Sequence, residues 1–284
     1  MYKVIIIIFC LYTTTLFAKT IPPLTIVINE DVYRDYLCVL NNQNVLMVKD
    51  YGGKCSRREV VEIILVQQML ALGGFQYQFI LDPEYYNMRE RKLLKEGLLL
   101  INVDSVWQSE AIAMENHVYI SPPLIRKKEY HAGFYTSADN QNVLLTNSVE
   151  QLKRLSIVSN KNWTIDWTNL SKAGFMRVAH EEQWMSQASL VNKHLIDVML
   201  IPFSNADDLS YQIKSIELKP ISNFKFPLHE SRHVIISKKH PLGGETYKAL
   251  IKGMEIMRAK GLITKAFEHS GLFNPGVKDW QRVN

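Results

Sequence analysis

The sequence predicts an α/β protein made of two similar units. Its first half alternates short apolar segments, rich in β-branched residues, with segments of helical character, and its second half repeats this order. Strands that alternate with helices pair in parallel, because each helix returns the chain to the start of the next strand. A length of 284 residues, of which 47% are apolar, fits one large or two smaller domains.

The first half contains three predicted strands and two predicted helices. Residues 24–29 form a continuous apolar run after Pro22 and Pro23, which is typical of a buried strand. Ser56 and Glu59 have the spacing of a capping box, and they predict the start of a helix that ends at Gly73-Gly74. The other expected elements are a strand over 75–81, a helix over 87–97 and a strand over 98–103.

The second half follows the same plan. We expect strands over 152–159, 175–180 and 195–203, and helices over 164–174 and 181–194. The chain then ends with a strand over 233–242, a long helix over 244–261 and a short helix over 262–273.

The N-terminus resembles a secretion signal over residues 1–18. Lys3 precedes nine apolar residues, Val4–Tyr12, a run too short to cross a bilayer of about 30 Å. An uncleaved membrane anchor is the alternative. Removal of this segment takes away one lysine and lowers the formal net charge from +5 to +4. The remaining charges form no block of five like charges, so we expect no nucleic-acid or membrane partner.

Cysteine content agrees with export. Only Cys38 and Cys55 remain after the signal, and a single pair in an oxidising compartment predicts a disulfide, with two free thiols as the alternative. Two cysteines at this spacing offer too few ligands for a metal site, and we expect no metal and no cofactor.

Several motifs, in order along the chain, resemble bacterial extracellular solute-binding proteins of ABC importers, in particular the amino-acid-binding-like branch. The segment His233–Phe273 resembles the C-terminus of that family. Tyr119–Pro123 resembles its "fS.PY" segment, and Asn147–Leu152 resembles "sleDLk". Ile157–Asn160 and Ile196–Met199 resemble two further segments of that family, which lie at the ends of strands.

This resemblance implies a type II periplasmic-binding-protein fold. Such a fold has two α/β lobes, each with a mostly parallel sheet flanked by helices, two interlobe crossings and a ligand cleft between the lobes. Residues 19–130 and 233–284 would form lobe 1, and residues 131–232 would form lobe 2.

The chain departs from the amino-acid-binding pattern at two positions. The family's carboxylate-binding Arg would fall close to Met114, and its ammonium-binding Asp would fall at Pro202-Phe203. Both parts of the amino-acid clamp are therefore missing, which puts a standard α-amino acid in doubt.

Strand ends and the helix N-termini that follow them are where open α/β sheets bind ligands. Their aromatic, Asn and Ser side chains suit a neutral or aromatic small molecule, although loop or core packing is the alternative for each residue. The candidate ligand-binding residues are Asn29, Glu30, Asp104, Ser105, Trp107, Ser121, Ser159, Asn160, Trp163, Phe203 and Ser204.

Enzyme motifs are missing from the sequence. The eight histidines have no metal-binding spacing, and there is no nucleophile elbow, phosphate loop or dinucleotide fingerprint. We therefore expect a periplasmic, monomeric binding protein that captures a small polar or aromatic molecule and delivers it to an inner-membrane ABC permease. A sensor or accessory protein without transport is the alternative, and a dehydratase on the same fold is a further one.

Overall fold

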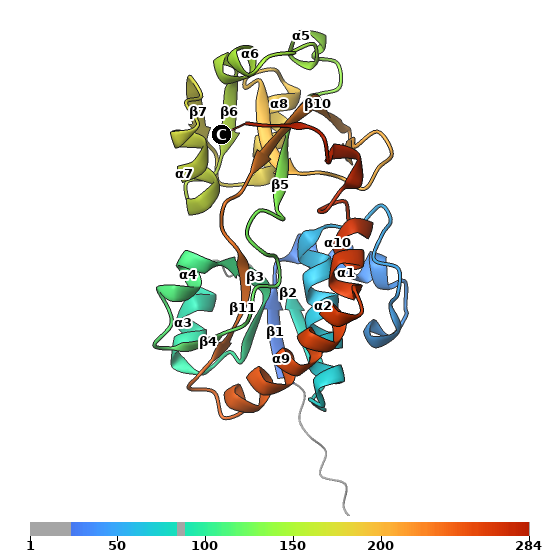
Figure 1. Ribbon diagram of the computed structural model, residues 1–284, viewed down its shortest axis with the longest axis vertical. Helices are drawn as coiled ribbons and strands as arrows, with labels where there is room; N and C mark the ends of the chain where they lie inside the picture. Colours follow the sequence, from blue (N-terminus) through green and yellow to red (C-terminus); the bar gives the residue numbers. More distant parts are fainter. Residues whose placement is uncertain (1–23, 84–88, 284) are drawn as a thin grey trace, which may run out of the picture.

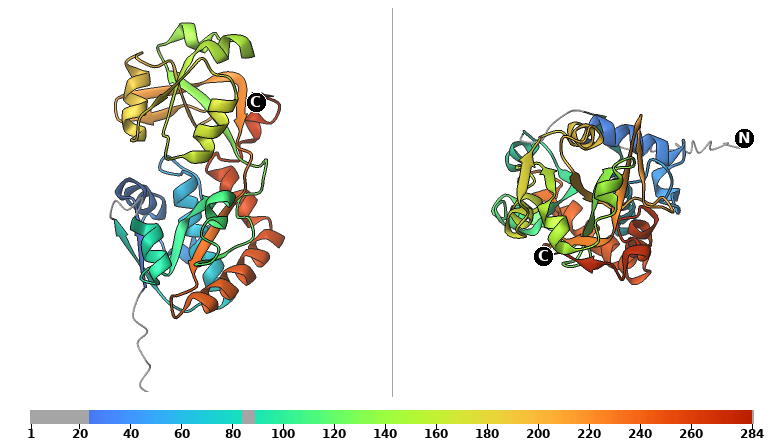
Figure 2. Two further views of the ribbon diagram at one scale, coloured as in Figure 1. Left: turned by 90° about the vertical axis from the view of Figure 1, so that its left-hand side faces the viewer. Right: turned by 90° about the horizontal axis from the view of Figure 1, so that it is seen from above.

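The computed structural model describes residues 24–83 and 89–283. The predicted signal peptide lies outside the described residues. Figures 1 and 2 show two lobes stacked along the long axis of the molecule. Within the described residues, no helix is long and apolar enough to cross a membrane.

Lobe 1 is the lower lobe in Figure 1. Its strands β1 and β2 pair in parallel, whereas β11 lies between β3 and β4 and is antiparallel to both. The strands are β1 (Leu24–Ile28), β2 (Phe79–Pro83), β3 (Ile101–Trp107), β4 (Val118–Ile120) and β11 (Arg232–Ser237). The helices are α1 (Glu30–Leu40), η1 (Val45–Met47), α2 (Arg58–Gly73), α3 (Arg89–Glu96), α4 (Gln108–Ile112), α9 (Gly243–Ala259) and α10 (Leu262–His269).

Lobe 2 contains a seven-stranded sheet with the order β12-β10-β5-β8-β6-β7, to which β9 adds by pairing with β10. The strands are β5 (His131–Ser137), β6 (Ser156–Ser159), β7 (Arg177–His180), β8 (Val198–Pro202), β9 (Tyr211–Ile213), β10 (Ile216–Pro227) and β12 (Gln281–Arg282). The helices are α5 (Gln141–Leu144), α6 (Val149–Arg154), α7 (Thr164–Lys172), α8 (Trp184–Asn192) and η2 (Pro275–Val277).

Both lobes contain parallel and antiparallel strand pairs, because strands next to the crossings run in the opposite direction. In lobe 2, the β6–β7 and β6–β8 pairs are parallel, as the strand–helix–strand order predicts, whereas β5 is antiparallel to β8 and β10. In lobe 1, β11 returns from lobe 2 and is antiparallel to β3. Parallel pairing therefore holds for the strand–helix–strand units and not for the returning strands.

The end of the chain corrects the predicted lobe boundary. The chain passes from one lobe to the other before β5, at His131, and before β11, at Arg232. A third crossing follows α10, since β12 pairs in parallel with β10 of lobe 2. Lys225 of β10 fixes this segment by donating hydrogen bonds from Nζ to the carbonyls of Val277 and Lys278, at 2.7 and 2.6 Å. The assignment of the whole of 233–284 to lobe 1 is therefore wrong for its last residues.

Two local predictions are also wrong. Ser56 does not cap α2; its hydroxyl donates to the carbonyl of Tyr51, and Arg57 takes the N-cap position. The expected strand over 152–159 begins only at Ser156, because residues 149–154 form α6 with Ser148 as its N-cap. The C-terminal end of α2 is as predicted, with Gly74 in the left-handed region at φ 98°.

Helix α2 is fixed in lobe 1 by close packing against α9. A Cβ atom on Gly253 would lie 1.8 Å from the carbonyl oxygen of Met69, and one on Gly73 would lie 1.9 Å from that of Ala249. Only glycine allows the two helix backbones to approach this closely. The apolar residues of α2 from Val60 to Leu70 are buried, so this part of the helix is a rigid support for the polar side chains along it.

The predicted disulfide is confirmed. Cys38 at the end of α1 is bonded to Cys55, with an S–S distance of 1.99 Å and a sequence separation of 17 residues. The bond closes a loop that includes η1 and leads directly into α2.

Candidate ligand-binding site between the lobes

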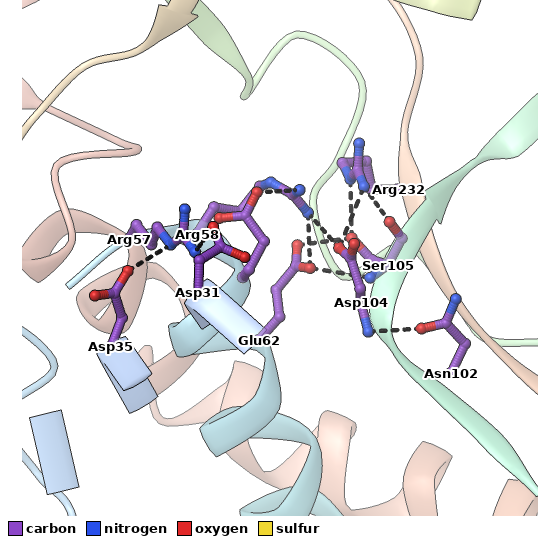
Figure 3. Close-up of polar contacts among 10 residues, drawn as sticks. Asp31, Asp35, Arg57, Arg58, Glu62, Asn102, Asp104, Ser105 and Arg232 are labelled. Carbon is purple, nitrogen blue, oxygen red and sulfur yellow. Dashed lines mark hydrogen bonds and ion pairs between the residues drawn. The ribbon is translucent and has the colours of Figure 1, made fainter. Parts of the chain in front are cut away.

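Arg58, the first residue of α2, is surrounded by three carboxylates on the side of lobe 1 that faces lobe 2 (Figure 3). Its Nη1 atom donates to Glu62 Oε2 at 2.8 Å and to Asp104 Oδ1 at 2.9 Å, and its Nη2 atom donates to Glu59 Oε1 at 2.7 Å. Arg58 is buried and Glu62 is fully buried, whereas the Asp104 side chain is 48% exposed. Asp104 is thus the carboxylate of this group that faces solvent.

The buried carboxylate of Glu62 receives hydrogen bonds from two further groups. Ser105 donates from its backbone N–H to Oε2 at 2.9 Å and from its hydroxyl to Oε1 at 2.6 Å. Burial raises the pKa of Glu62 to about 7, although Arg58 and Arg232 favour its ionised form. Burial also opposes ionisation of Glu59, but Arg58 and Arg57 outweigh it and hold the pKa of Glu59 at about 2.

A second arginine enters from the crossing that returns to lobe 1. Arg232 begins β11, and its Nε atom donates to Ser105 Oγ at 2.9 Å while Nη2 donates to the Ser105 carbonyl. Its Nη2 atom also lies 3.6 Å from Asp104 Oδ1. The guanidinium lies 4.5 Å from the ring centre of Trp107, and the Trp107 ring also stacks on the ring of Tyr130 at 5.6 Å. We call Arg57, Arg58, Glu59, Glu62, Asp104, Ser105 and Arg232 the interlobe cluster.

Arg57 connects the interlobe cluster to α1 and to lobe 2. It forms ion pairs with Asp31 at 2.6 Å and with Asp35 at 3.0 Å. Its guanidinium lies 5.9 Å from the ring centre of Trp184, the first residue of α8 in lobe 2. This contact shows that the N-terminus of α2 faces the N-terminus of α8 across the lobe boundary.

Lobe 2 contributes a carboxylate and a tyrosine to the same region. Burial raises the pKa of Asp166 on α7 to about 6, opposed by the charges of Arg232 and Arg58 in lobe 1. Burial also raises the pKa of Tyr211 above its usual range, and the charge of Glu59 raises it further. Asp166 and Tyr211 therefore lie close enough to the interlobe cluster to sense its charges.

Carboxylates outnumber arginines at this site. Among the described contacts, Asp31, Asp35, Glu59, Glu62, Asp104 and Asp166 interact with Arg57, Arg58 and Arg232, and the charge of Arg34 also acts on Asp35. Full ionisation of these groups would leave two negative charges in excess. The arginines of lobe 1 are moreover already paired with protein groups, so the site as a whole is acidic.

Three residues predicted from the sequence lie in or against the interlobe cluster. Asp104 and Ser105 belong to it, and Trp107 is the platform on which Arg232 stacks. Trp107 is only 4% exposed, so its function here is to orient Arg232.

The other predicted residues of lobe 1 lie outside the cluster. Asn29 is the N-cap of α1 and Glu30 is its first residue, and neither makes a hydrogen bond or ion pair with the cluster among the described contacts. Ser121 is buried; its hydroxyl donates to the Pro122 carbonyl at 2.7 Å and accepts from the Val234 N–H at 3.0 Å. Ser121 thus joins the first crossing to β11.

The predicted residues of the β6–α7 junction have structural partners. Asn160 donates to the Glu182 carbonyl at 2.8 Å and accepts from the Asn162 N–H at 2.8 Å, and Ser159 is 2% exposed. Trp163 is the N-cap of α7 and is 36% exposed, one turn before Asp166.

Phe203 and Ser204 are corrections to the predicted site. Phe203 is 1% exposed and packs against Trp280 at 5.3 Å and Tyr135 at 6.3 Å in the core of lobe 2. The Ser204 hydroxyl donates to the Ser210 carbonyl at 2.8 Å, which fixes the loop after β8. Trp280 reaches Phe203 only because the chain crosses a third time, and this crossing was not predicted.

Sequence reasoning missed Arg58, Glu62 and Arg232. Glu62 interrupts the apolar run 60–66, and a carboxylate inside a buried helix requires a cationic or hydrogen-bonding partner. That signal indicates an arginine one turn away, which is Arg58. Arg232 had no comparable signal, because its contacts depend on the crossing that returns β11 beside β3. The described residues contain no group of His, Cys, Asp and Glu that could hold a metal ion.

No family model and no curated protein matches the sequence. The fold does match solved structures. The probable amino-acid ABC transporter extracellular-binding protein ytmK from Bacillus subtilis has a TM-score of 0.58 at 11% identity, covering 89% of this chain and 100% of that one. The periplasmic VFT2 domain of Bordetella pertussis BvgS has a TM-score of 0.54 at 14% identity, covering 72% and 81%. The ancestral amino acid-binding protein AncCDT-1, a precursor of cyclohexadienyl dehydratase, has a TM-score of 0.53 at 14% identity, covering 88% and 95%.

The chain therefore has the two-lobed type II periplasmic-binding-protein fold, a ligand-binding fold. This finding confirms the fold and the resemblance expected from the sequence. Identities of 10–15% show a common fold and do not transfer a ligand.

Proposed function

We propose that this chain is an exported solute-binding protein whose ligand carries a positively charged group. The excess of carboxylates over arginines at the interlobe cluster supports this proposal most strongly. Asp104 is the half-exposed member of the cluster, and both of its arginine contacts use Oδ1. A ligand ammonium or guanidinium would bind the second oxygen of Asp104 from lobe 1 and Asp166 from lobe 2.

Such a ligand would act by lobe closure. A cation placed between Asp104 and Asp166 attracts both lobes toward each other, and this interaction exists only when the lobes are close. The ligand therefore stabilises the closed state by its higher affinity for that state. Trp184 and Tyr211 of lobe 2 supply aromatic surface beside the charge.

The pairing of the arginines argues against a standard α-amino acid. Arg58 is held by three carboxylates, and Arg232 is held by Ser105, Trp107 and Asp104. A ligand carboxylate would have to displace one of these partners and would add negative charge to an acidic site. A small amine or guanidine without a carboxylate avoids both costs, which revises the neutral or aromatic ligand expected from composition.

The cellular role follows from this binding activity. The predicted signal sequence and the confirmed disulfide support a periplasmic location, and the fold supports delivery of the ligand to an inner-membrane ABC permease. The alternative role is that of a sensor, in which the same closure transmits a signal and no ligand is transported.

A thermal-shift screen with matched ligand pairs tests the proposal. The pairs are putrescine and 1,4-butanediol, and arginine and citrulline, with agmatine and glutamate as further members. A ligand at 100 times its dissociation constant adds about 2.7 kcal/mol to the free energy of unfolding, which raises the melting temperature by a few degrees. We expect shifts with the cations, largest for those without a carboxylate. A shift with uncharged 1,4-butanediol and none with putrescine or agmatine would refute a ligand held by its positive charge.

A further inference from the structure

A second concave site lies on lobe 1, outside the interlobe cluster. It is a groove of about 460 Å³, within the usual range of small-molecule pockets, about 300–1,000 Å³. One wall is the disulfide-closed loop, through Val48 and Tyr51; another is the last part of α2, through Gln68 and Leu72; the ends of α9 and α10 complete it. Gln68 and Arg58 are ten residues apart on α2, or about 15 Å along the helix axis.

The polar groups in the floor of the groove are already paired. The Gln68 amide nitrogen donates to the carbonyls of Val45 and Val48, both at 2.9 Å. Its amide oxygen accepts from the Tyr51 hydroxyl at 2.6 Å. These bonds join the loop to α2 and occupy the Gln68 amide and the Tyr51 hydroxyl. A ligand would therefore gain mainly apolar contact there.

Apolar side chains supply that contact at a surface position. Leu46 and Leu72 are 49% and 46% exposed, although both are large hydrophobic residues. Val48 and Met257 also line the groove, and both are buried. The disulfide and the Gln68 bonds fix the loop in place, so the apolar surface is formed before any ligand binds.

Two lysines at the edge of the groove determine the charge that it favours. Lys49 comes from the loop and Lys265 from α10, and neither forms an ion pair within 4.0 Å among the described residues. The adjacent acidic residue, Asp50, is bonded to His269 Nδ1 at 2.8 Å and to the Gly52 N–H at 3.0 Å. The groove thus combines an apolar floor with the ammonium groups of Lys49 and Lys265 at its edge, although the charge of Lys265 also acts on Asp50.

We propose that this groove binds a small amphiphilic anion, an apolar chain or ring that carries one carboxylate or sulfonate. The apolar part would lie on Leu72, Met257 and Leu262, and the anionic group would lie between Lys49 and Lys265. This site differs from the interlobe cluster in position and in the charge of its ligand, so it does not depend on the proposed function.

Octanoate is a suitable probe, with 1-octanol as its uncharged counterpart. Binding would be measured by displacement of the fluorescent sulfonate 1-anilinonaphthalene-8-sulfonate and by NMR shifts of backbone amides. We expect saturable octanoate binding, with shifts in residues 45–51 and at Lys265, and affinity for 1-octanol lower by about tenfold or more. A tenfold change corresponds to about 1.4 kcal/mol, the strength of one charge-assisted contact.

Three variants make the test specific. Lys49→Gln with Lys265→Gln should weaken octanoate binding about tenfold, and Ala71→Phe should abolish it by filling the groove. Lys252→Gln, a matched loss of an exposed lysine on α9, should leave it unchanged. The proposal is overturned if octanoate does not bind saturably, if octanoate and octanol bind equally, or if the double lysine variant and Ala71→Phe bind octanoate like the unchanged protein.

Discussion

The interlobe cluster and the groove on lobe 1 both include residues of helix α2, and they differ in the polarity of the side chains that form them. At the N-terminus of α2, charged side chains are buried and paired with one another. Toward its C-terminus, Gln68 is hydrogen-bonded to the disulfide loop and Leu72 is exposed to solvent. The charged groups there are Lys49 and Lys265, which form no ion pair within 4.0 Å among the described residues. A rigid helix can therefore support one site that selects by charge and another that selects by apolar contact.

The difference also concerns stability. A buried charge that loses its partner is costly, whereas an exposed lysine contributes little. We therefore expect changes at the interlobe cluster to affect both folding and binding, and changes at the exposed lysines of the groove to affect binding alone.

Loss of one positive charge at each site gives the largest expected contrast. Arg58→Met leaves the fully buried Glu62 without its arginine, and we expect the free energy of unfolding to fall by about 3 kcal/mol at pH 8. The matched change Lys265→Met should alter it by less than about 0.5 kcal/mol. Urea denaturation of both variants measures this. Equal effects would show that the interlobe charges are not an energetically coupled network.

Removal of the disulfide should affect the groove and spare the cluster. Cys38→Ser with Cys55→Ser frees a loop of 17 residues, which is expected to cost about 3 kcal/mol of stability by loop entropy. Amide hydrogen exchange should accelerate over residues 45–51 more than at the start of β11. Uniform acceleration across lobe 1 would contradict a local function for the bond.

Glu62 should make stability depend on pH. Its pKa is raised from an ordinary 4.5 to about 7, so between these values the folded protein holds a proton that the unfolded chain has lost. The resulting stability is fully present below pH 4.5 and falls by up to about 3 kcal/mol as the pH rises to 7. Glu59, with a pKa of about 2, stabilises the fold above pH 4.5 and loses that effect as the pH falls.

Denaturation of the unchanged protein and of Glu62→Gln between pH 5 and pH 8 separates these contributions. The difference in stability between the two proteins should change with pH over this window, because glutamine does not titrate. A difference that stays constant from pH 5 to pH 8 would mean that Glu62 is ionised throughout.

Ligand affinity gives the smallest predicted effect. Asp166→Asn removes one of the two carboxylates proposed to hold the ligand cation, and we expect about tenfold weaker binding of the strongest cation from the screen. Asp139→Asn, an exposed aspartate of lobe 2 paired with His194, is the matched control and should bind normally. Calorimetric titration measures both. Unchanged affinity in Asp166→Asn would remove lobe 2 from the proposed site.

The sequence predicted the elements of the fold better than their contacts. Strand–helix–strand units were recognisable because alternation of apolar and helical segments is a local pattern, as at residues 24–29 and 60–72. The third crossing was not recognisable, because β12 has only two residues and depends on its partner β10. Pairing between distant segments leaves little trace in a two-residue strand.

The candidate site was predicted in part for the same reason. Asp104 and Ser105 follow from the rule that ligands bind near strand ends. Arg58 and Arg232 come from a helix N-terminus and a crossing, and only the folded chain brings them to Asp104. The apolar residues around Glu62 in the sequence indicate that this carboxylate needs a partner. The burial of Phe203 depends on its contact with Trp280, which the sequence does not reveal.

A crystal structure of the complex with the strongest cation from the screen tests the central claim most directly. The account predicts closed lobes with the ligand's ammonium or guanidinium group within hydrogen-bonding distance of both Asp104 and Asp166. A ligand bound elsewhere, or one whose carboxylate displaces Glu62 or Asp104 from Arg58, would contradict it.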